Sequence, residues 1–247
     1  MEDTQASREI RHGKFLARGD PELTWGWGTP AGRVRALRRA ELIAKKAMLG
    51  PGVRALEIGC GTGMFTEMFA KTGADIVAVD ISADLLEKAH KRNLPNDRVR
   101  FVRKQFEQCD TEGPFDAVVG SSVLHHLAMP SALGKIYDLL KPGGVMSFAE
   151  PNMLNPQIFI ERKFRRLFPR VSADETAFVR WRLAAVLQKE KFADIRIVPF
   201  DWLHPSVPRS LVGAVSNFGR ALERIPVLRE FSGSLHISAV RPSAGST

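Results

Sequence analysis

A short run of glycines, followed by an acid at the end of the next apolar run, is the part of this chain best suited to hold a ligand. Gly59, Gly61 and Gly63 predict a turn between a buried strand and a helix, where backbone can approach a ligand with no Cβ in the way. Asp80 follows the apolar run Asp75–Val79, so its carboxylate is expected at the same sheet edge, where an acid can accept two hydrogen bonds from a ribose diol. Together these features predict a nucleoside-containing cofactor across the carboxyl ends of two neighbouring strands.

The spacing of the glycines argues against two common phosphate-binding turns. A dinucleotide turn needs G-x-G-x-x-G, whereas Met64 follows the third glycine directly. A P-loop needs a Lys-Ser or Lys-Thr pair after its glycines, and Lys71-Thr72 comes too late. Glu57, two residues before the first glycine, would repel a pyrophosphate but would favour a cationic ligand.

The segment from Glu57 to Gly63 reads E-x-G-x-G-x-G and resembles motif I of the class I S-adenosylmethionine-dependent methyltransferases. The resemblance extends from about residue 54 to residue 151 and continues in order through Asp80-Ile81-Ser82, the strand 115–119, the loop 121–127 and the turn 139–144. It implies a methyltransferase enzyme with S-adenosylmethionine as cofactor and S-adenosylhomocysteine as product. The implied fold is α/β, a doubly wound, mostly parallel seven-stranded sheet (Rossmann-like) with an antiparallel final strand.

The resemblance also implies which residues contact the cofactor. Gln105 falls where the family usually has an aspartate for the adenine amino group, and a glutamine carbonyl can accept the same hydrogen bond. Phe106 beside it has two interpretations, a contact with the adenine face or a place in the core. The expected cofactor contacts are Glu57, Gly59, Cys60, Gly61, Gly63, Asp80, Ile81, Gln105, Phe106 and Ser121.

Two histidines and a glutamate follow neighbouring strands and suggest general-base chemistry. Methyl transfer to an oxygen of high pKa needs a base, and histidine suits neutral pH. His125 and His126 come just after one predicted strand and Glu150 ends the next, so the carboxylate can orient an imidazole. We predict that one histidine is the base, His125 first, with Glu150 orienting it. A structural or cofactor-contact role for the pair stays open.

Four further residues are predicted to contact the methyl acceptor. Asn152 and Asn155 follow Glu150, with the alternative that they are turn and cap residues beside proline. Trp25 and Trp27 alternate with glycines in a segment between prolines that is not expected to form a helix, and we place it at the pocket mouth. The alternative is that the two rings anchor a terminal arm. Because no His, Asp or Glu cluster has ligand spacing, we expect no metal.

The elements that position these residues form one domain with additions. Between residues 54 and 148 strands alternate with helical stretches, which favours a parallel sheet. We divide the chain into an N-terminal arm or lid, 1–30, whose first 20 residues are expected to be loosely docked, and a single methyltransferase domain, 31–247. Two insertions, at about 151–176 and 203–231, leave from strand ends and are predicted to be helical covers of the substrate site.

Composition restricts the partners and the compartment. The chain has 247 residues, a formal net charge of +9 and 44% hydrophobic residues, enough for a substantial core. A polar N-terminus, the lack of any apolar run long enough to span a membrane, and only two cysteines predict a cytoplasmic protein. The basic clusters are compatible with a solvated helix face, an acidic small substrate or an anionic membrane surface, whereas no nucleic-acid-binding module is evident and no nucleic acid is expected.

The favoured function is methylation, at oxygen, of a small-molecule metabolite or an intermediate of secondary metabolism, with a histidine base. One alternative is a lipid- or quinone-directed methyltransferase at a membrane surface, suggested by the apolar, proline-punctuated and arginine-containing segment 205–231. Another is a non-catalytic, cofactor-binding partner protein, suggested only by Gln105. The sequence leaves open which acceptor is used, which atom is methylated and which oligomeric state the protein has.

Overall fold

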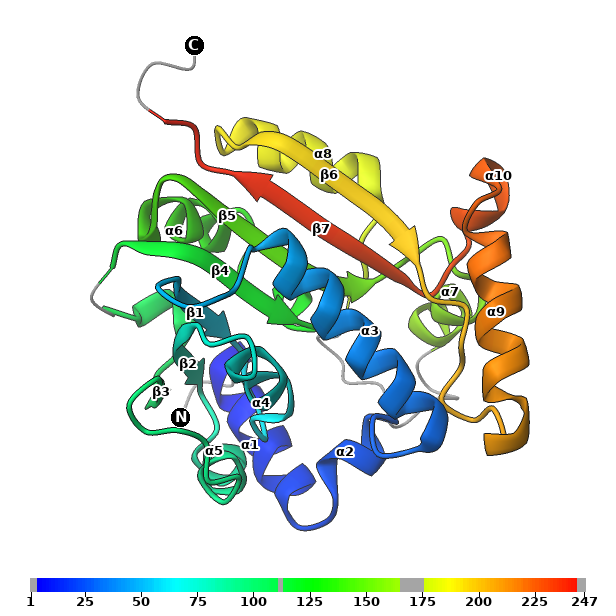
Figure 1. Ribbon diagram of the computed structural model, residues 1–247, viewed down its shortest axis with the longest axis horizontal. Helices are drawn as coiled ribbons and strands as arrows, with labels where there is room; N and C mark the ends of the chain where they lie inside the picture. Colours follow the sequence, from blue (N-terminus) through cyan, green and yellow to red (C-terminus); the bar gives the residue numbers. More distant parts are fainter. Residues whose placement is uncertain (1–3, 111–112, 165–175, 244–247) are drawn as a thin grey trace.

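A computed structural model of the chain describes residues 4–110, 113–164 and 176–243. A seven-stranded sheet runs through its centre in the order β3-β2-β1-β4-β5-β7-β6 (Figure 1). The strands are β1 Arg54–Ile58, β2 Asp75–Asp80, β3 Val99–Arg103, β4 Phe115–Ser121, β5 Leu140–Pro151, β6 Ala193–Phe200 and β7 Ser234–Val240. Strands β1 to β5 pair in parallel, and β7 runs antiparallel to both of its neighbours. The predicted fold class and antiparallel final strand are therefore confirmed.

The strand order places a ligand crevice where the sequence motifs lie. Successive strands run outward from β1 through β2 to β3, whereas β4 pairs on the opposite side of β1. In open α/β sheets ligands bind outside the carboxyl ends of the strands at such a switch point. The glycine turn follows β1 and the histidine pair follows β4, so both motifs are at this edge of the sheet.

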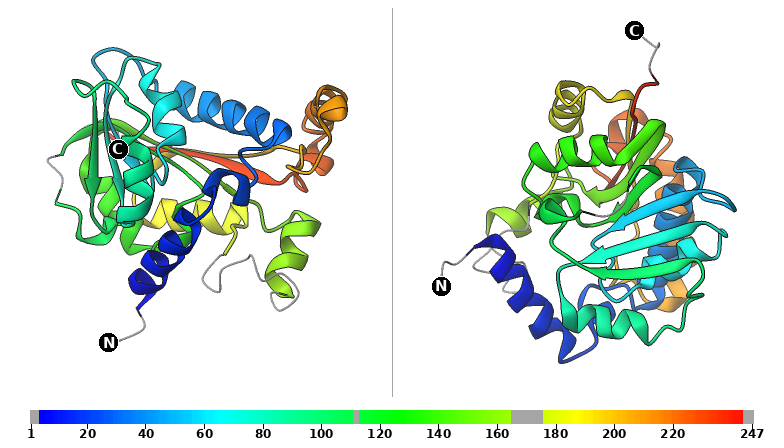
Figure 2. Two further views of the ribbon diagram at one scale, coloured as in Figure 1. Left: turned by 90° about the horizontal axis from the view of Figure 1, so that it is seen from below. Right: turned by 90° about the vertical axis from the view of Figure 1, so that its left-hand side faces the viewer.

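Helices cover both faces of the sheet, which explains why the central strands are almost continuously apolar. On one face lie α3 Pro30–Lys46, α4 Met64–Ala70 and α5 Ala83–His90, with Ile43 and Phe69 fully buried beneath them. On the other lie α6 Ser131–Leu139 and α8 Arg180–Lys189, which pack with Leu133, Phe148 and Leu187. Figure 2 shows these two helical layers from two further directions.

The N-terminal arm is more ordered than predicted. Helix α1, Gln5–Ala17, packs against α5, and a Cβ on its Gly13 would lie only 2.5 Å from the hydroxyl of Ser82. Helix α2, Pro21–Thr24, lies within the segment expected to contain no helix, because Asp20 caps it and proline occupies its first turn. The predictions that the first 20 residues are loosely docked and that the segment 21–30 contains no helix were therefore both wrong. The contacts that fix α1 come from distant residues, and the Asp20-Pro21 start signal was overlooked.

Both insertions contain helices. The first includes α7, Pro156–Lys163, while its residues 165–175 lie outside the described part of the chain. The second contains a 3-10 turn, Arg209–Leu211, then α9, Val212–Leu222, and α10, Pro226–Arg229, which stand past the end of β6 and the start of β7 (Figure 1). No helix within the described ranges is long and apolar enough to cross a membrane.

Candidate active site

The turn between β1 and α4 has the backbone conformation that its glycines predict. Gly59, Gly61 and Gly63 have φ values of 67°, 52° and 75°. Residues with a Cβ rarely adopt this left-handed backbone conformation. A Cβ on Gly59 would also fall 2.4 Å from Val123 in the loop after β4. The turn therefore needs glycine both for its conformation and because the loop after β4 packs closely against it.

Asp80 is aimed at this turn from the end of β2. Its Oδ2 accepts a hydrogen bond from the Gly61 amide and its Oδ1 accepts one from the Ser82 amide, each at 2.8 Å. Burial raises the pKa of Asp80, although these backbone hydrogen bonds oppose the shift. The carboxylate is thus fixed in position at the crevice and can still accept a hydrogen bond from a further donor.

Glu57 is a buried acid without a full set of partners. It is 2% exposed, and its Oε2 is a buried oxygen with no hydrogen-bond partner in the structure. Burial raises the pKa of Glu57 to about 8, with a smaller contribution from the neighbouring charge of Asp80. A donor or a positive charge next to this oxygen would be stabilised, whereas an anion would not.

These three features fit S-adenosylmethionine, which combines a ribose, a positively charged sulfonium and an amino group. Asp80 would hold the ribose, the glycine turn leaves backbone accessible, and Glu57 favours the cationic part. Glu57 pairs in register with Val119 of β4, so Gly59 and Ser121 follow side by side at the same sheet edge. The structure thereby brings together Glu57, the glycines, Asp80, its neighbour Ile81, and Ser121.

Other predicted cofactor residues lie deeper or further away. Phe106 is 4% exposed in the core beneath α6, so the core interpretation describes its position in this structure. Gln105 immediately precedes the 3-10 turn Phe106–Gln108 and is partly exposed after β3, as the adenine assignment requires. Cys60 is 6% exposed, and burial raises the pKa of its thiol well above the ordinary value, so it is an inert small residue of the turn.

His125 and Glu150 form a buried pair. His125 Nδ1 lies 2.6 Å from Glu150 Oε2, and their side chains are 2% and 0% exposed. The other carboxylate oxygen, Oε1, accepts hydrogen bonds from the amides of Val123 and Leu124 at 2.9 and 3.0 Å. Burial alone would raise the pKa of Glu150, but the hydrogen bonds from His125 and from these amides outweigh it and hold the pKa below the ordinary value. An ionised Glu150 selects the His125 tautomer protonated at Nδ1, which leaves Nε2 able to accept a proton.

His126 is engaged by the N-terminal arm. Its Nδ1 lies 3.1 Å from Glu9 Oε1 of α1, and the Gln5 side chain donates to its backbone carbonyl. The centroids of the His125 and His126 rings are 4.1 Å apart. Helix α1 therefore closes over the loop that carries both histidines, an arrangement that the charged N-terminal sequence did not predict.

An open pocket of about 530 Å³ lies beside His125. Apolar side chains line it together with His125 and two neutral polar side chains, a combination found in small-molecule sites. The lining residues are Gln5, Leu124, His125, Leu127, Ala128, Met129, Thr176 and Phe178. Of these, sequence reasoning named only His125, because the others come from the arm, the loop and the first insertion and share no local pattern.

The two tryptophans of the arm have different environments. A Cβ on Gly61 would lie 3.4 Å from the Trp25 ring, so this partly exposed indole covers the glycine turn. Trp27 is 9% exposed and packs edge-on against Phe65, with ring centroids 5.7 Å apart. The structure thus places Trp25 at the cofactor crevice, whereas Trp27 anchors the arm to the core.

The two asparagines predicted to bind acceptor are used within the protein. Asn152 is 1% exposed and donates to the backbone carbonyls of Glu230 and Ser232. Asn155 caps α7 by accepting from the amides of Gln157 and Ile158. The structure does not bring either side chain to the pocket beside His125.

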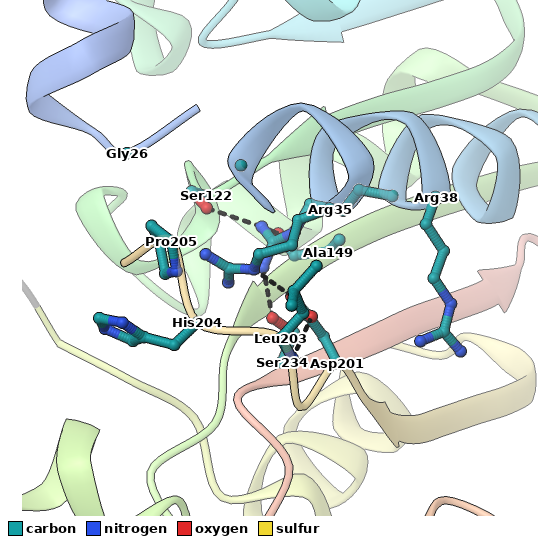
Figure 3. Close-up of polar contacts among 12 residues, drawn as sticks. Gly26, Arg35, Arg38, Ser122, Ala149, Asp201, Leu203, His204, Pro205 and Ser234 are labelled. Carbon is teal, nitrogen blue, oxygen red and sulfur yellow. Dashed lines mark hydrogen bonds and ion pairs between the residues drawn. The ribbon is translucent and has the colours of Figure 1, made fainter. Parts of the chain in front are cut away.

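A buried arginine was missed by the sequence analysis. Arg39 of α3 is 2% exposed and donates to the hydroxyls of Ser121, Ser122 and Ser234 and to the carbonyl of Ala149. These partners end β4 and β5 and begin β7, and Figure 3 shows Ser122, Ala149 and Ser234 gathered beneath α3. Burial, and then the neighbouring charge of Arg35, lowers the pKa of Arg39 to about 10. The basic residues of α3 are therefore not a single solvated face.

Metal-ligating side chains do not gather in this site. Across the ranges that the structure describes, no three His, Cys, Asp or Glu side chains come together in a way that could hold a metal ion.

Comparison with known proteins agrees with the motif and the fold. Residues 56–146 match the family described as "Methyltransferase domain". A ubiquinone biosynthesis O-methyltransferase of Xylella fastidiosa (strain 9a5c) is 33% identical over 146 residues, which cover 56% of this chain and 57% of that protein. Nodulation protein S of Rhizobium tropici is 27% identical over 146 residues, covering 58% of this chain and 59% of the relative. The chain thus spans little more than half the length of the curated relatives it matches.

Solved structures share the fold over nearly the whole chain. The N-methyltransferase NodS from Bradyrhizobium japonicum WM9, in complex with S-adenosylhomocysteine, has a TM-score of 0.65 at 18% identity and covers 95% of this chain and 98% of its own. The [4+2]-cyclase SpnF has a TM-score of 0.65 at 20% identity, covering 94% of this chain and 95% of its own. At such identities the likeness concerns fold alone, and a cyclase among the neighbours illustrates that fold does not fix the reaction. Residues 56–146 thus carry a methyltransferase domain, and the glycine turn and the sheet topology are similar to those of the class I S-adenosylmethionine-dependent methyltransferases.

Proposed function

We propose that this protein transfers a methyl group from S-adenosylmethionine to an oxygen atom of a small-molecule acceptor, with His125 as the general base. The observation that supports this proposal is the buried His125–Glu150 pair, joined at 2.6 Å beside an open pocket. When bound, the cofactor supplies an electrophilic methyl group on a positively charged sulfur. Glu57, the turn Gly59–Gly63 and Asp80 would hold it.

The protein's own residues prepare the acceptor. Glu150 keeps the proton of His125 on Nδ1, so that Nε2 takes the proton from an acceptor hydroxyl as that oxygen becomes nucleophilic. Imidazolium formed in this way is stabilised by the ionised Glu150, whose pKa is held below the ordinary value. The apolar side chains of Leu127, Met129 and Phe178 would contact and orient an acceptor that presents an apolar or aromatic body.

The matched pair His125→Gln and His126→Gln tests the base assignment, because the two residues are adjacent and the change is the same. Removing a general base typically costs about a hundredfold or more in kcat. We expect this loss for His125→Gln, with cofactor affinity measured by calorimetry almost unchanged, and only a small loss for His126→Gln. Turnover by His125→Gln at the rate of the parent protein would refute the assignment.

The acceptor atom is tested with a panel of phenols, catechols, carboxylic acids and amines, with mass spectrometry of the products. Methylation at oxygen supports the proposal. Products methylated only at nitrogen would overturn the oxygen assignment, and cofactor binding without transfer to any acceptor would favour a non-catalytic, cofactor-binding role.

A second candidate acceptor is a quinol or another lipid. The ubiquinone biosynthesis O-methyltransferases among the relatives favour it, together with the apolar wall of the pocket beside His125. Catechol acceptors with and without a long isoprenoid tail distinguish the two candidates. A much lower KM for the tailed acceptor supports a lipid substrate, and equal values support a small polar metabolite.

A further inference from the structure

The second insertion presents an apolar helix face to solvent. Leu211, Ala214, Phe218, Ala221 and Ile225, which we call the outer stripe, follow one another at intervals of three and four residues, the spacing of one face of a helix. All five are exposed, with Leu211 at 52%, Phe218 at 65% and Ile225 at 46%. In α10, Val227 and Leu228 are also exposed, at 69% and 38%. A soluble helix normally turns such a face towards the core, and this one does the opposite.

The opposite side of α9 is the side that packs. Gly219 is the buried residue of this helix, and a Cβ there would lie 2.8 Å from Trp202. Glu223, on the same side, pairs with Arg38 of α3 and accepts from the Asp201 amide. The helix is therefore fixed to the domain by the side that carries Gly219 and Glu223, and the outer stripe lies on its exposed side. Helix α9 itself stands past the end of β6 (Figure 1).

Charge is distributed asymmetrically along the same segment. Its two acids are tied inward, Glu223 to Arg38 and Glu230 to Arg180, with side chains 13% and 19% exposed. By contrast, the segment's arginines Arg209, Arg220 and Arg224 are exposed. The exposed charges of this segment are thus positive, while its acids are paired with the rest of the domain.

We propose that α9 and α10 form a docking surface for an anionic lipid membrane, with the outer stripe lying among the acyl chains and the flanking arginines on the headgroups. A helix that lies in the membrane surface typically combines a large apolar face with basic residues. Such a helix binds the membrane without crossing it. The overall charge of +9 adds attraction to an anionic surface. The inference does not rest on the proposed function, because docking requires neither the cofactor nor a particular acceptor.

Charge complementarity favours a membrane over a second copy of this chain. A twofold contact through the outer stripe would repeat the same patch on both subunits. It would bring the exposed arginines of two segments closer together, with the acids of each segment already paired inside its own subunit. Anionic headgroups would instead neutralise these arginines.

Sedimentation of the full chain with phosphatidylglycerol–phosphatidylcholine vesicles tests the proposal, with phosphatidylcholine vesicles as the uncharged comparison and no cofactor or acceptor present. We expect binding to anionic vesicles at low salt that weakens as salt is raised. Phe218→Ser should reduce the partition coefficient about tenfold or more, because a phenyl ring no longer leaves water. Arg220→Gln and Arg224→Gln should each reduce it about fivefold.

Phe15→Ser is the matched control, since Phe15 of α1 is 66% exposed and Phe218 is 65% exposed. This variant should bind vesicles like the parent protein, and thermal unfolding checks that each variant is folded. Absence of binding to anionic vesicles at low salt would overturn the proposal, as would an equal loss with Phe15→Ser. A dimer that dissociates in Phe218→Ser, without vesicle binding by the parent, would assign the outer stripe to a second copy instead.

Discussion

Glu57 couples the cofactor site to pH. Its pKa is about 8 in the folded protein, against an ordinary value of 4.5. Between these values the folded state keeps a proton that the unfolded state has lost. The contribution of Glu57 to stability is therefore complete below about pH 4.5 and is lost as the pH rises through 8.

A cation bound next to Glu57 should favour the ionised form of Glu57 over the protonated form, because a positive charge stabilises the carboxylate. We expect binding of S-adenosylmethionine near pH 7 to release up to one proton, and affinity to rise as the pH approaches 8. Calorimetry in two buffers of different ionisation enthalpy measures the proton release. Glu57→Gln should abolish the release, whereas Glu87→Gln on the exposed side of α5 should leave it intact. The same release from Glu57→Gln would show that another group is responsible.

Arg39 holds three strand ends together with one guanidinium group. It reaches Ser122 and Ala149 on one side and Ser234 on the other. Ser122 has a φ of 56° and begins the turn whose next two amides bind Glu150, so Arg39 acts on the candidate base through the backbone.

Arg39→Met should destabilise the protein by about 3 kcal/mol, because several hydrogen bonds to a charged group are lost and their buried partners stay unpaired. Urea unfolding measures this change. Arg33→Met, on the exposed side of the same helix, is the control and should change stability by less than about 0.5 kcal/mol. Equal stability of the two variants would mean that Arg39 contributes nothing to joining the strands.

At the scale of elements, α2 and the Trp25 that follows it lie against the glycine turn. Glu22 accepts a hydrogen bond from Thr62 and pairs with Arg92, while Trp25 lies against Gly61. A cofactor in the crevice must enter and leave past this turn of helix. Glu22→Gln should therefore speed cofactor dissociation several-fold and increase proteolysis of the arm, because a partly buried ion pair is lost.

Stopped-flow release of S-adenosylhomocysteine measures the effect of Glu22→Gln, with the exposed Glu41→Gln of α3 as the charge-matched control. A release rate unchanged from the parent protein would mean that α2 does not restrict the crevice.

The sequence predicted elements whose signals are local and missed those fixed by distant contacts. The glycine turn, Asp80 and the alternation of strands and helices each have a short-range pattern, and the His125–Glu150 contact follows from two parallel strands ending at one edge. By contrast, docking of α1 on His126 depends on Glu9 and Gln5, more than a hundred residues away. Arg39 stands among other basic residues, and nothing in the sequence distinguishes it from its solvated neighbours.

At the scale of the whole molecule, one sheet separates two cores that cannot form independently. Phe148 belongs to the core on the α6 and α8 side and Phe69 to the core on the α3 and α4 side, and both are fully buried. Both cores pack against the same strands, one on each face of the sheet. Unfolding of either core would therefore expose strands against which the other core packs. We therefore expect residues 31–247 to unfold as one cooperative domain.

Calorimetry of Phe148→Ala and Phe69→Ala tests this cooperativity. Each substitution should lower stability by about 3–5 kcal/mol, the usual cost of removing a buried phenylalanine ring. Both should move the same single transition to lower temperature, because each destabilises the shared sheet. Phe15→Ala, at a site 66% exposed, should leave the transition within about a degree of the parent. Two separate transitions, of which each variant moves only one, would mean that the two faces are independent units and that the chain is divided differently.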